Sequence, residues 1–208
     1  MSVTRFVPAA LVAAVVLLPA SASAQQIGAK AGVNFASLSN TEDFIPEDGQ
    51  RIGLAAGLFV TVPATERLSF QIEGLYAEKG VTGSLEEFGI PIEGNLRLQY
   101  LEVPVLGRAD FGTPGSSSNF YIVAGAAPAF KLDARLKLEA LGEEETVDLS
   151  DDMESFDFGL VGGAGLELGR LGLEARYTHG LLSISKDDAD DEPVKNKVFT
   201  VSVSYRFR

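Results

Sequence analysis

The chain closes on Val198-Phe-Thr-Val-Ser-Val-Ser-Tyr-Arg-Phe-Arg208, where apolar and polar residues alternate. Every second residue from Phe199 to Phe207 is apolar or aromatic, and the residues between them carry hydroxyl groups or charge. A period of two predicts a β-strand, because successive side chains leave opposite faces of the backbone. We expect this strand either to form an open sheet edge or to close a barrel by pairing with an earlier segment.

The same alternation recurs along the chain after Gln25, between breaks rich in glycine, proline and acidic residues. It predicts eight strands, which we place at Ile27–Ser37, Ile52–Val62, Arg67–Lys79, Leu98–Phe111, Asn119–Arg135, Ser155–Leu168, Leu171–Ser183 and Val198–Arg208. The apolar parity changes near Tyr100, which predicts a β-bulge or a strand start there. Pro128 lies inside a predicted strand and cannot donate a ladder hydrogen bond, which predicts a local break.

The breaks between these segments are of two kinds. The short ones are Pro63–Glu66, Gly112–Ser118 and Gly169–Arg170. The long ones, which carry most of the 29 acidic residues, are Ser37–Arg51, Gly80–Asn95, Leu136–Glu154 and Ile184–Lys197. Short turns at one end of an up-and-down antiparallel structure and long loops at the other are typical of bacterial outer-membrane barrels.

The first residues predict a secretory signal peptide over residues 1–24. Arg5 precedes the apolar run Val7–Leu18, and Ala22-Ser-Ala24 is a small-residue cleavage site before Gln25. A membrane anchor is the alternative, but it needs about 20 apolar residues and this run is shorter. We therefore expect residues 25–208 to form one mature domain.

Overall composition restricts the partners. The formal net charge of −12 argues against nucleic acid, because phosphate binding needs a basic surface. The chain has no cysteine, so no disulfide supports the fold.

Alternation alone does not distinguish a barrel in lipid from a lipocalin-like barrel in water, which would turn its apolar parity inward. Three features favour lipid. The polar parity is rich in glycine, which makes room in a narrow lumen. The apolar parity places aromatic residues near both ends of the strands, as membrane interfaces favour. The strands are also long enough to cross a bilayer, where an open edge is forbidden. We predict an all-β fold, a closed eight-stranded antiparallel up-and-down transmembrane β-barrel in an outer membrane.

Several short blocks along the chain resemble a known family. They are Lys30-Ala-Gly-Val-Asn34, Gln71-Ile-Glu-Gly-Leu-Tyr76, Tyr100-Leu-Glu-Val-Pro104, Asp157-Phe-Gly-Leu-Val-Gly-Gly-Ala-Gly165, Arg176-Tyr-Thr-His-Gly-Leu181 and Tyr205-Arg-Phe207. In their order and spacing they are similar to the PorT-like outer-membrane β-barrel family, often labelled "porin family". The resemblance implies that Tyr205 and Phe207 form the signal read by the barrel-assembly machinery, although Arg208 follows them here. A link to protein secretion is implied for some members only.

Charged residues of both signs fall on the inward parity. We expect a mid-lumen cluster formed by Glu73, Glu102, Arg108, Glu174 and Arg176. One interpretation is a path for ions or protons. The favoured one is a structural plug, because an eight-stranded interior is filled by its own side chains and unpaired buried charge is costly.

No cofactor, metal site or catalytic set is expected. His179 is the only histidine, and an enzyme at the rim, such as a protease or acyltransferase, would need Ser183, Ser185 or the nearby Asp187 within its reach. The parity of His179 points it outward. The acidic run Asp187–Glu192 offers carboxylates to divalent cations but lacks the glycine and spacing of an EF-hand.

The sequence therefore predicts a non-enzymatic outer-membrane protein with a structural or interaction role, and a narrow porin-like channel is the alternative. The expected partners are outer-membrane lipid, the barrel-assembly machinery and, through the acidic loops, other envelope proteins.

Overall fold

The computed structural model describes residues 25–39, 49–87, 90–112, 117–140, 143–185 and 193–207, with backbone alone at 85–87 and 90–92. The predicted signal peptide, the acidic run Asp187–Glu192 and Arg208 lie outside these ranges. Within them the fold is all-β and antiparallel, with ten strands in one sheet. The strands are β1 (Gln26–Leu38), β2 (Arg51–Pro63), β3 (Leu68–Glu87), β4 (Ile90–Glu102), β5 (Val105–Asp110), β6 (Ser118–Ala140), β7 (Glu143–Asp148), β8 (Phe156–Leu168), β9 (Leu171–Gly180) and β10 (Asn196–Arg206). No helix in the described ranges is long and apolar enough to cross a membrane.

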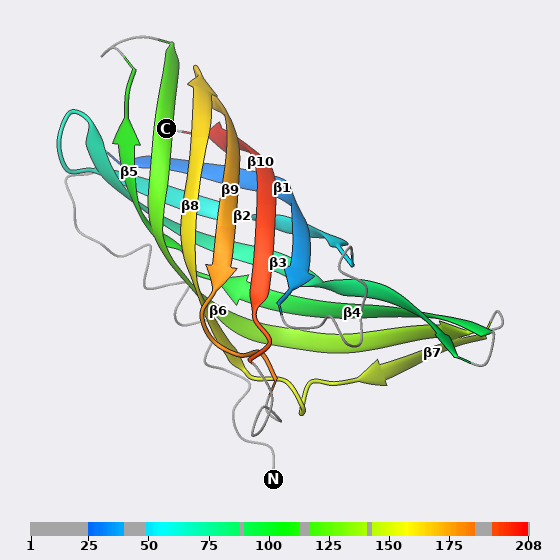
Figure 1. Cartoon of the computed structure of the whole chain (residues 1–208). Helices are drawn as coiled ribbons and strands as arrows, with labels where there is room; N and C mark the ends of the chain where they lie inside the picture. Colours follow the sequence, from blue (N-terminus) through cyan, green and yellow to red (C-terminus); the bar gives the residue numbers. More distant parts are fainter. Residues whose placement is uncertain are drawn as a thin grey trace.

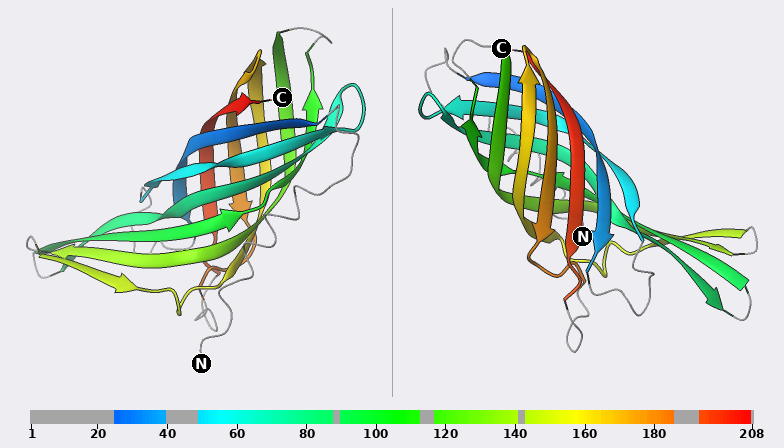
Figure 2. Two further views of the ribbon diagram at one scale, coloured as in Figure 1. Left: turned by 180° about the vertical axis from the view of Figure 1, so that it is seen from behind. Right: turned by 45° about the horizontal axis from the view of Figure 1, so that its top comes forward.

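The strand pairings return to their starting point. The order runs β2-β1-β10-β9-β8-β6-β4-β3, and β2 also pairs with β3 (Figures 1 and 2). The prediction that the first and last segments pair is confirmed, with Phe35 opposite Phe199 and Ala29 opposite Tyr205. Because every strand of the ring has two neighbours, its backbone polar groups are paired on both sides.

The count of ten strands differs from the predicted eight at two places. The predicted segment Leu98–Phe111 is divided into β4 and β5 by Val103 and Pro104, and both parts lie between β3 and β6. A proline cannot donate to the ladder, which accounts for the interruption. The second addition is β7, which pairs with β6 inside a segment predicted as loop.

The two predicted irregularities have different outcomes. The register shifts between Gln99 and Tyr100, as predicted, and the extra residue is Leu132 on β6. The predicted ladder break at Pro128 is confirmed on one side only: pairing with β4 ends at Ala129 and pairing with β5 resumes at Ala126, whereas β6 stays paired with β8 through Pro128. The Pro128 carbonyl accepts from Val103 N–H at 2.9 Å, so the proline nitrogen faces the interruption between β4 and β5.

Four strands continue beyond the ring at the long-loop end. β2 pairs with β3 only as far as Ala77, and beyond it β3, β4, β6 and β7 pair with one another in that order. Figures 1 and 2 show this extension projecting sideways from the ring. We call residues 80–87, 90–97, 135–140 and 143–148 the wing. The predicted loops Gly80–Asn95 and Leu136–Glu154 are thus largely paired strand, because their backbones hydrogen-bond to each other.

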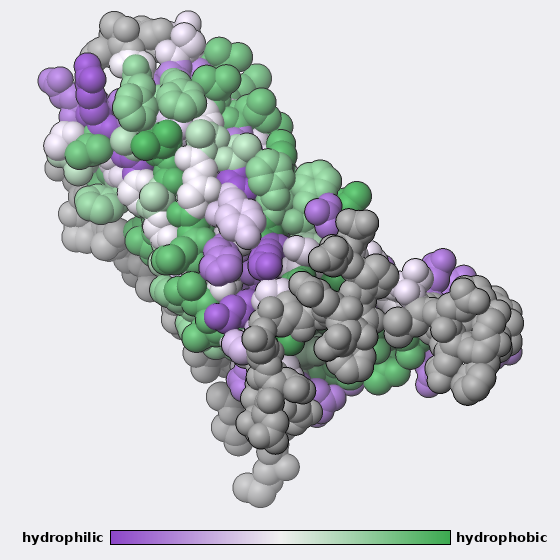
Figure 3. Space-filling model, viewed as in Figure 1, coloured by the Kyte–Doolittle hydropathy of each residue, from purple (hydrophilic) through white to green (hydrophobic). Residues whose placement is uncertain are grey.

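The ring turns its apolar parity outward and its polar parity inward. On β9, Leu173 and Tyr177 are about half exposed, whereas Glu174 and Arg176 are buried. Figure 3 shows the resulting apolar surface over β8, β9 and β10. A barrel folded in water would show the reverse arrangement, because burial of apolar surface drives its folding.

Candidate functional site

Four charged side chains from three strands meet in the middle of the lumen. Lys30 Nζ on β1 lies 2.7 Å from Glu73 Oε1 on β3 and 3.0 Å from Glu174 Oε1 on β9. Arg176, also on β9, donates through Nη1 and Nη2 to the two Glu73 oxygens, each at 2.9 Å, and pairs with Glu174. We call these residues the central ion group. Its two positive and two negative charges balance, and each side chain is at most 6% exposed.

Neutral side chains complete the hydrogen bonding of this group. Gln71 Nε2 donates to Glu73 Oε1 at 2.5 Å, and the Tyr121 hydroxyl donates to Glu174 Oε2 at 3.1 Å. Gly165 on β8 leaves space for the Tyr121 ring, since a Cβ at this position would overlap the phenol. This contact illustrates why a narrow lumen favours glycine on the inward parity.

A second group lies nearer the long loops. Lys79 Nζ is 2.5 Å from Glu102 Oε1 and 3.5 Å from Asp157 Oδ2, and it lies 4.9 Å from the centroid of the Tyr100 ring. Asn196 Nδ2 donates to Asp157 at 2.9 Å. We call Lys79, Glu102 and Asp157 the loop-end ion group.

A third group lies at the end with the short turns. Arg108 Nη2 is 2.7 Å from Asp110 and 2.9 Å from Glu167, and its guanidinium stacks 3.8 Å from the centroid of the Tyr121 ring. Arg206 Nη1 reaches Glu167 at 3.4 Å. This turn-end ion group is more open to solvent than the others, with Asp110 and Arg206 about a quarter exposed.

The five residues predicted to form one cluster are thus distributed over three groups. Glu73, Glu174 and Arg176 meet in the centre, whereas Glu102 joins the loop-end group and Arg108 the turn-end group. The predicted cluster lacks their lysine partners. Lys30 and Lys79 share the inward parity, but parity does not specify which strands they reach. Lys30 on β1 contacts β3 and β9, and Lys79 on β3 contacts β4 and β8.

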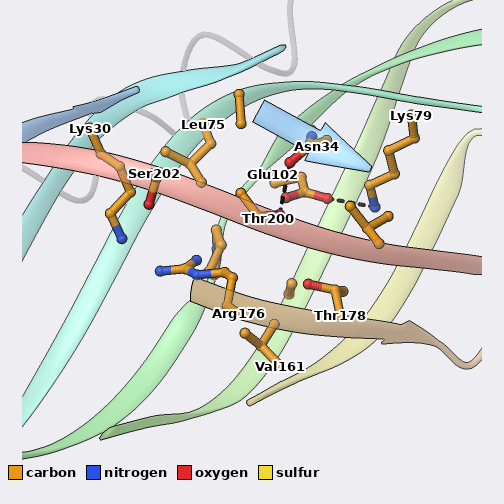
Figure 4. Close-up of a pocket in the computed structure, with 14 residues that line it drawn as sticks. Lys30, Asn34, Leu75, Lys79, Glu102, Val161, Arg176, Thr178, Thr200 and Ser202 are labelled. Atoms are coloured by element: carbon orange, nitrogen blue, oxygen red, sulfur yellow. Dashed lines mark hydrogen bonds and ion pairs between the residues drawn. The ribbon is translucent and has the colours of Figure 1, made fainter. Parts of the chain in front are cut away.

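A small cavity separates the central and loop-end ion groups. Figure 4 shows Lys30, Arg176 and Ser202 toward one end, and Lys79 and Glu102 toward the other. Its volume is about 20 Å³, room for a single water molecule. The Ser202 hydroxyl lines it and has no hydrogen-bond partner in the described part of the protein.

An apolar cluster closes the lumen toward the long loops. Leu98, Tyr100, Ala129, Ala134 and Ile184 are all nearly inaccessible to solvent. The apolar residues near Tyr100 that seemed out of phase are therefore interior residues. The neighbouring segments pack on them, with Glu154 N–H donating to the Ile184 carbonyl at 2.8 Å and Met153 bridging to Ser185. We call this cluster the apolar cap.

Aromatic pairs mark both ends of the outward face. At the long-loop end Phe35 lies 6.3 Å from Phe199, and Phe130 lies 5.4 Å from Phe156, between ring centroids. At the short-turn end, Phe111 packs against Phe120 at 5.9 Å.

The predicted assembly residues also lie at the short-turn end. Tyr205 and Phe207 pack on each other at 5.9 Å between ring centroids, and both are about half exposed. Phe207 N–H donates to the Ile27 carbonyl at 2.8 Å. Their side chains therefore face outward while the backbone completes the pairing with β1.

The wing has one apolar and one polar face. A row of paired residues, Val81, Leu96, Leu136 and Val147, crosses all four strands on the apolar face. On the polar face Lys137 Nζ lies 2.7 Å from Glu144, which raises the pKa of Lys137. Hydrogen bonds from Ser150 lower the pKa of Asp148.

The remaining sequence candidates lie apart from these groups. His179 is exposed on the outward face and stacks on Tyr177 at 6.4 Å between ring centroids. The Ser183 hydroxyl donates to the Val194 carbonyl at 3.4 Å, and Asp187 lies outside the described residues. In the ranges that the structure describes, no three His, Cys, Asp or Glu side chains are grouped to hold a metal ion.

Comparison with known proteins places these features in context. A family model described as "Outer membrane protein beta-barrel domain" matches residues 20–186. No curated protein matches the chain in sequence. Among solved structures, the chain is similar to the attachment invasion locus protein Ail of Yersinia pestis, with 16% identity, a TM-score of 0.42, and coverage of 88% of this chain and 99% of Ail. The chain is also similar to Neisserial surface protein A, with 14% identity, a TM-score of 0.45, and coverage of 88% of this chain and 97% of that protein. A third similar structure is OprG of Pseudomonas aeruginosa, with 12% identity, a TM-score of 0.47, and coverage of 89% of this chain and 97% of OprG.

Proposed function

The chain belongs to the outer membrane protein beta-barrel domain family, and from this premise we propose that it is a non-enzymatic outer-membrane protein with a plugged lumen and a surface for protein partners. In this proposal the ring crosses the membrane as a closed up-and-down barrel with eight strand positions. β4 and β5 together occupy one of these positions, between β3 and β6. The blocks around Lys30, Tyr100 and Arg176 support assignment to the PorT-like branch of the family. The observation that carries the proposal is the inverted burial, with apolar side chains outside and paired charges inside.

The membrane part of the proposal is supported by the outward face. From Ile27 to Ser37 on β1 and from Ile52 to Val62 on β2, the outward parity contains no charged residue. Charge in the hydrocarbon region costs several kcal/mol per residue at the centre of a barrel strand, about 2 to 4 for Arg or Lys. A protein recovered in the soluble periplasmic fraction, without a shift in gel mobility on heating, would refute this part.

The plug is supported by the order of features along the lumen. The apolar cap, the loop-end ion group, the central ion group and the turn-end ion group follow one another, and the cavity between two of them holds about one water molecule. A water-filled channel would need a continuous polar path. We therefore expect purified protein in planar bilayers to give no stable conductance. Stable, large openings from pure protein would favour the alternative of a narrow channel for small solutes.

The interaction surface is supported by the wing and its edge strand. All six residues of β7 are exposed, and among the described residues β7 pairs on one side only, with β6. Leu149 N–H donates to the Ala134 carbonyl, so by alternation the backbone N–H groups of Glu144, Thr146 and Asp148 face away from β6. A free strand edge can pair with an extended segment of another protein, and the acidic side chains beside it favour a basic one.

One substitution tests this edge. Thr146→Pro removes an outward N–H without touching a bond to β6, and Thr146→Ala keeps that N–H while it removes the same hydroxyl. Cross-linking in intact envelopes should capture envelope partners with the wild type and with Thr146→Ala, and fail with Thr146→Pro. Equal capture by all three would refute recognition through this edge. Gel mobility should show that all three remain folded.

A further inference from the structure

The outward faces of four neighbouring strands carry basic residues in one row only. On β1, β8, β9 and β10, the outward parity carries aliphatic, aromatic, small or hydroxyl side chains everywhere except at two places, His179 on β9 and Lys197 on β10. These two residues lie directly opposite each other in the β9–β10 ladder. Opposite residues of an antiparallel pair share one face, so their side chains stand side by side.

Their position along the strands is equally specific. The row immediately nearer the barrel centre is aromatic, with Tyr177 opposite Phe199 and Phe199 opposite Phe35. The row of His179 and Lys197 follows it toward the long loops. Figure 3 shows a hydrophilic patch bordering the apolar surface at the lower ends of these strands. Aromatic belts lie at the headgroup level of a bilayer, so the next row outward lies among the lipid headgroups.

The chemistry of the pair fits one class of ligand. Lys197 has no ion pair with any described residue, although the protein as a whole carries a net charge of −12. The Lys197 ammonium group provides three hydrogen-bond donors, and the neighbouring imidazole provides one more. A lone cation with a second donor beside it, at headgroup depth, matches a phosphate group.

We infer that His179 and Lys197 form a binding site for the phosphate of a membrane lipid in the leaflet at the long-loop end. The inference rests on the proposed membrane function, because only an inserted barrel presents this row to headgroups. No other charged side chain lies on the described outward faces of β1, β8, β9 and β10 to repel the phosphate. The site would thereby fix one lipid against β9 and β10.

Native mass spectrometry of the folded, full-length mature protein in detergent tests the site. The probe is dioleoylphosphatidic acid, and dioleoylglycerol, which has the same chains and no phosphate, is its control. Lys197→Gln should weaken phosphatidic acid binding about fivefold, the effect of one basic residue near a charged membrane surface. Adding His179→Gln should weaken it further, whereas dioleoylglycerol binding should stay unchanged.

Arg170→Gln is the matched control, because Arg170 is an exposed arginine at the opposite end of the barrel. An equal loss of binding in Arg170→Gln would overturn the site, as would unchanged binding in the double variant. Displacement of the lipid by an equal concentration of inorganic phosphate would overturn the assignment to lipid. These outcomes are separate from failure of the membrane proposal, in which the wild-type protein itself would not insert into vesicles or shift in gel mobility.

Discussion

Removal of the Glu73 carboxylate should destabilise the barrel strongly. Glu73 accepts hydrogen bonds from Lys30 at 2.7 Å, from Gln71 at 2.5 Å and from two Arg176 nitrogens at 2.9 Å, and its side chain is fully buried. In Glu73→Leu the two cations would share only Glu174. Breaking a buried ion pair by removing one partner costs about 3–5 kcal/mol.

The same substitution distinguishes a plug from a channel. In a water-filled lumen the pair would behave like a surface ion pair, worth about 0.2–1 kcal/mol. The double variant Lys30→Met with Glu73→Leu removes one charge of each sign and leaves Arg176 paired with Glu174. We expect it to recover most of the loss, because replacing a whole buried pair by apolar groups is often neutral or stabilising.

Urea-dependent unfolding in lipid vesicles provides the measurement. The chain has no tryptophan, so the folded fraction is followed by gel mobility and far-ultraviolet circular dichroism. Lys137→Gln, which breaks an exposed ion pair in the wing, serves as the control and should leave the unfolding midpoint unchanged. A loss below about 1 kcal/mol in Glu73→Leu would refute the plugged lumen.

Three further substitutions test other parts of the structure. A Cβ at Gly57 would overlap the Gly74 carbonyl oxygen, so Gly57→Val should prevent refolding into vesicles, whereas Gly74→Val, which meets nothing within 4 Å, should refold normally; equal refolding yields would contradict this. Ile184→Asp places an unpaired carboxylate in the apolar cap and should speed proteolysis near residues 181–185 while the ring stays protected, and unchanged cleavage would count against the cap. Phe207→Ala should lower the folded fraction in cell membranes without slowing refolding in vitro; equal effects in both settings would assign Phe207 to stability and not to assembly.

The ring was predictable because alternation is a local property. The pairing of β1 with β10 and the inward position of Glu73, Glu174 and Arg176 follow from a period of two and from closure. The strand β7 was missed because its sequence, Glu-Glu-Glu-Thr-Val-Asp, has the composition of a loop, and its extended form comes from pairing with β6. Tertiary pairing overrides such weak local preferences.

The ion groups were only partly predictable for a different reason. Parity assigns Glu102 and Arg108 to the lumen, but strand tilt and register decide their height along the axis. The lysine partners also depend on register and tilt, because Lys30 contacts carboxylates on β3 and β9, and Lys79 contacts carboxylates on β4 and β8. Likewise, alternation places Leu98 and Tyr100 out of phase only if every apolar residue faces outward, and these two face inward. The cap shows that one end of the lumen is itself apolar.

The separation of the wing from β1 and β10 has a consequence for sequence change. Beyond Ala77, the ladder pairings of the described wing strands are only with each other, so their length does not enter the register that closes the ring. Adding two residues to each strand of a wing hairpin would lengthen it and keep every side chain on the same face of the sheet. Adding one residue to each strand would move the side chains beyond the insertion to the opposite face. Homologous chains should therefore differ in wing length by even steps, while the spacing between Ala29 and Phe35 on β1 stays constant.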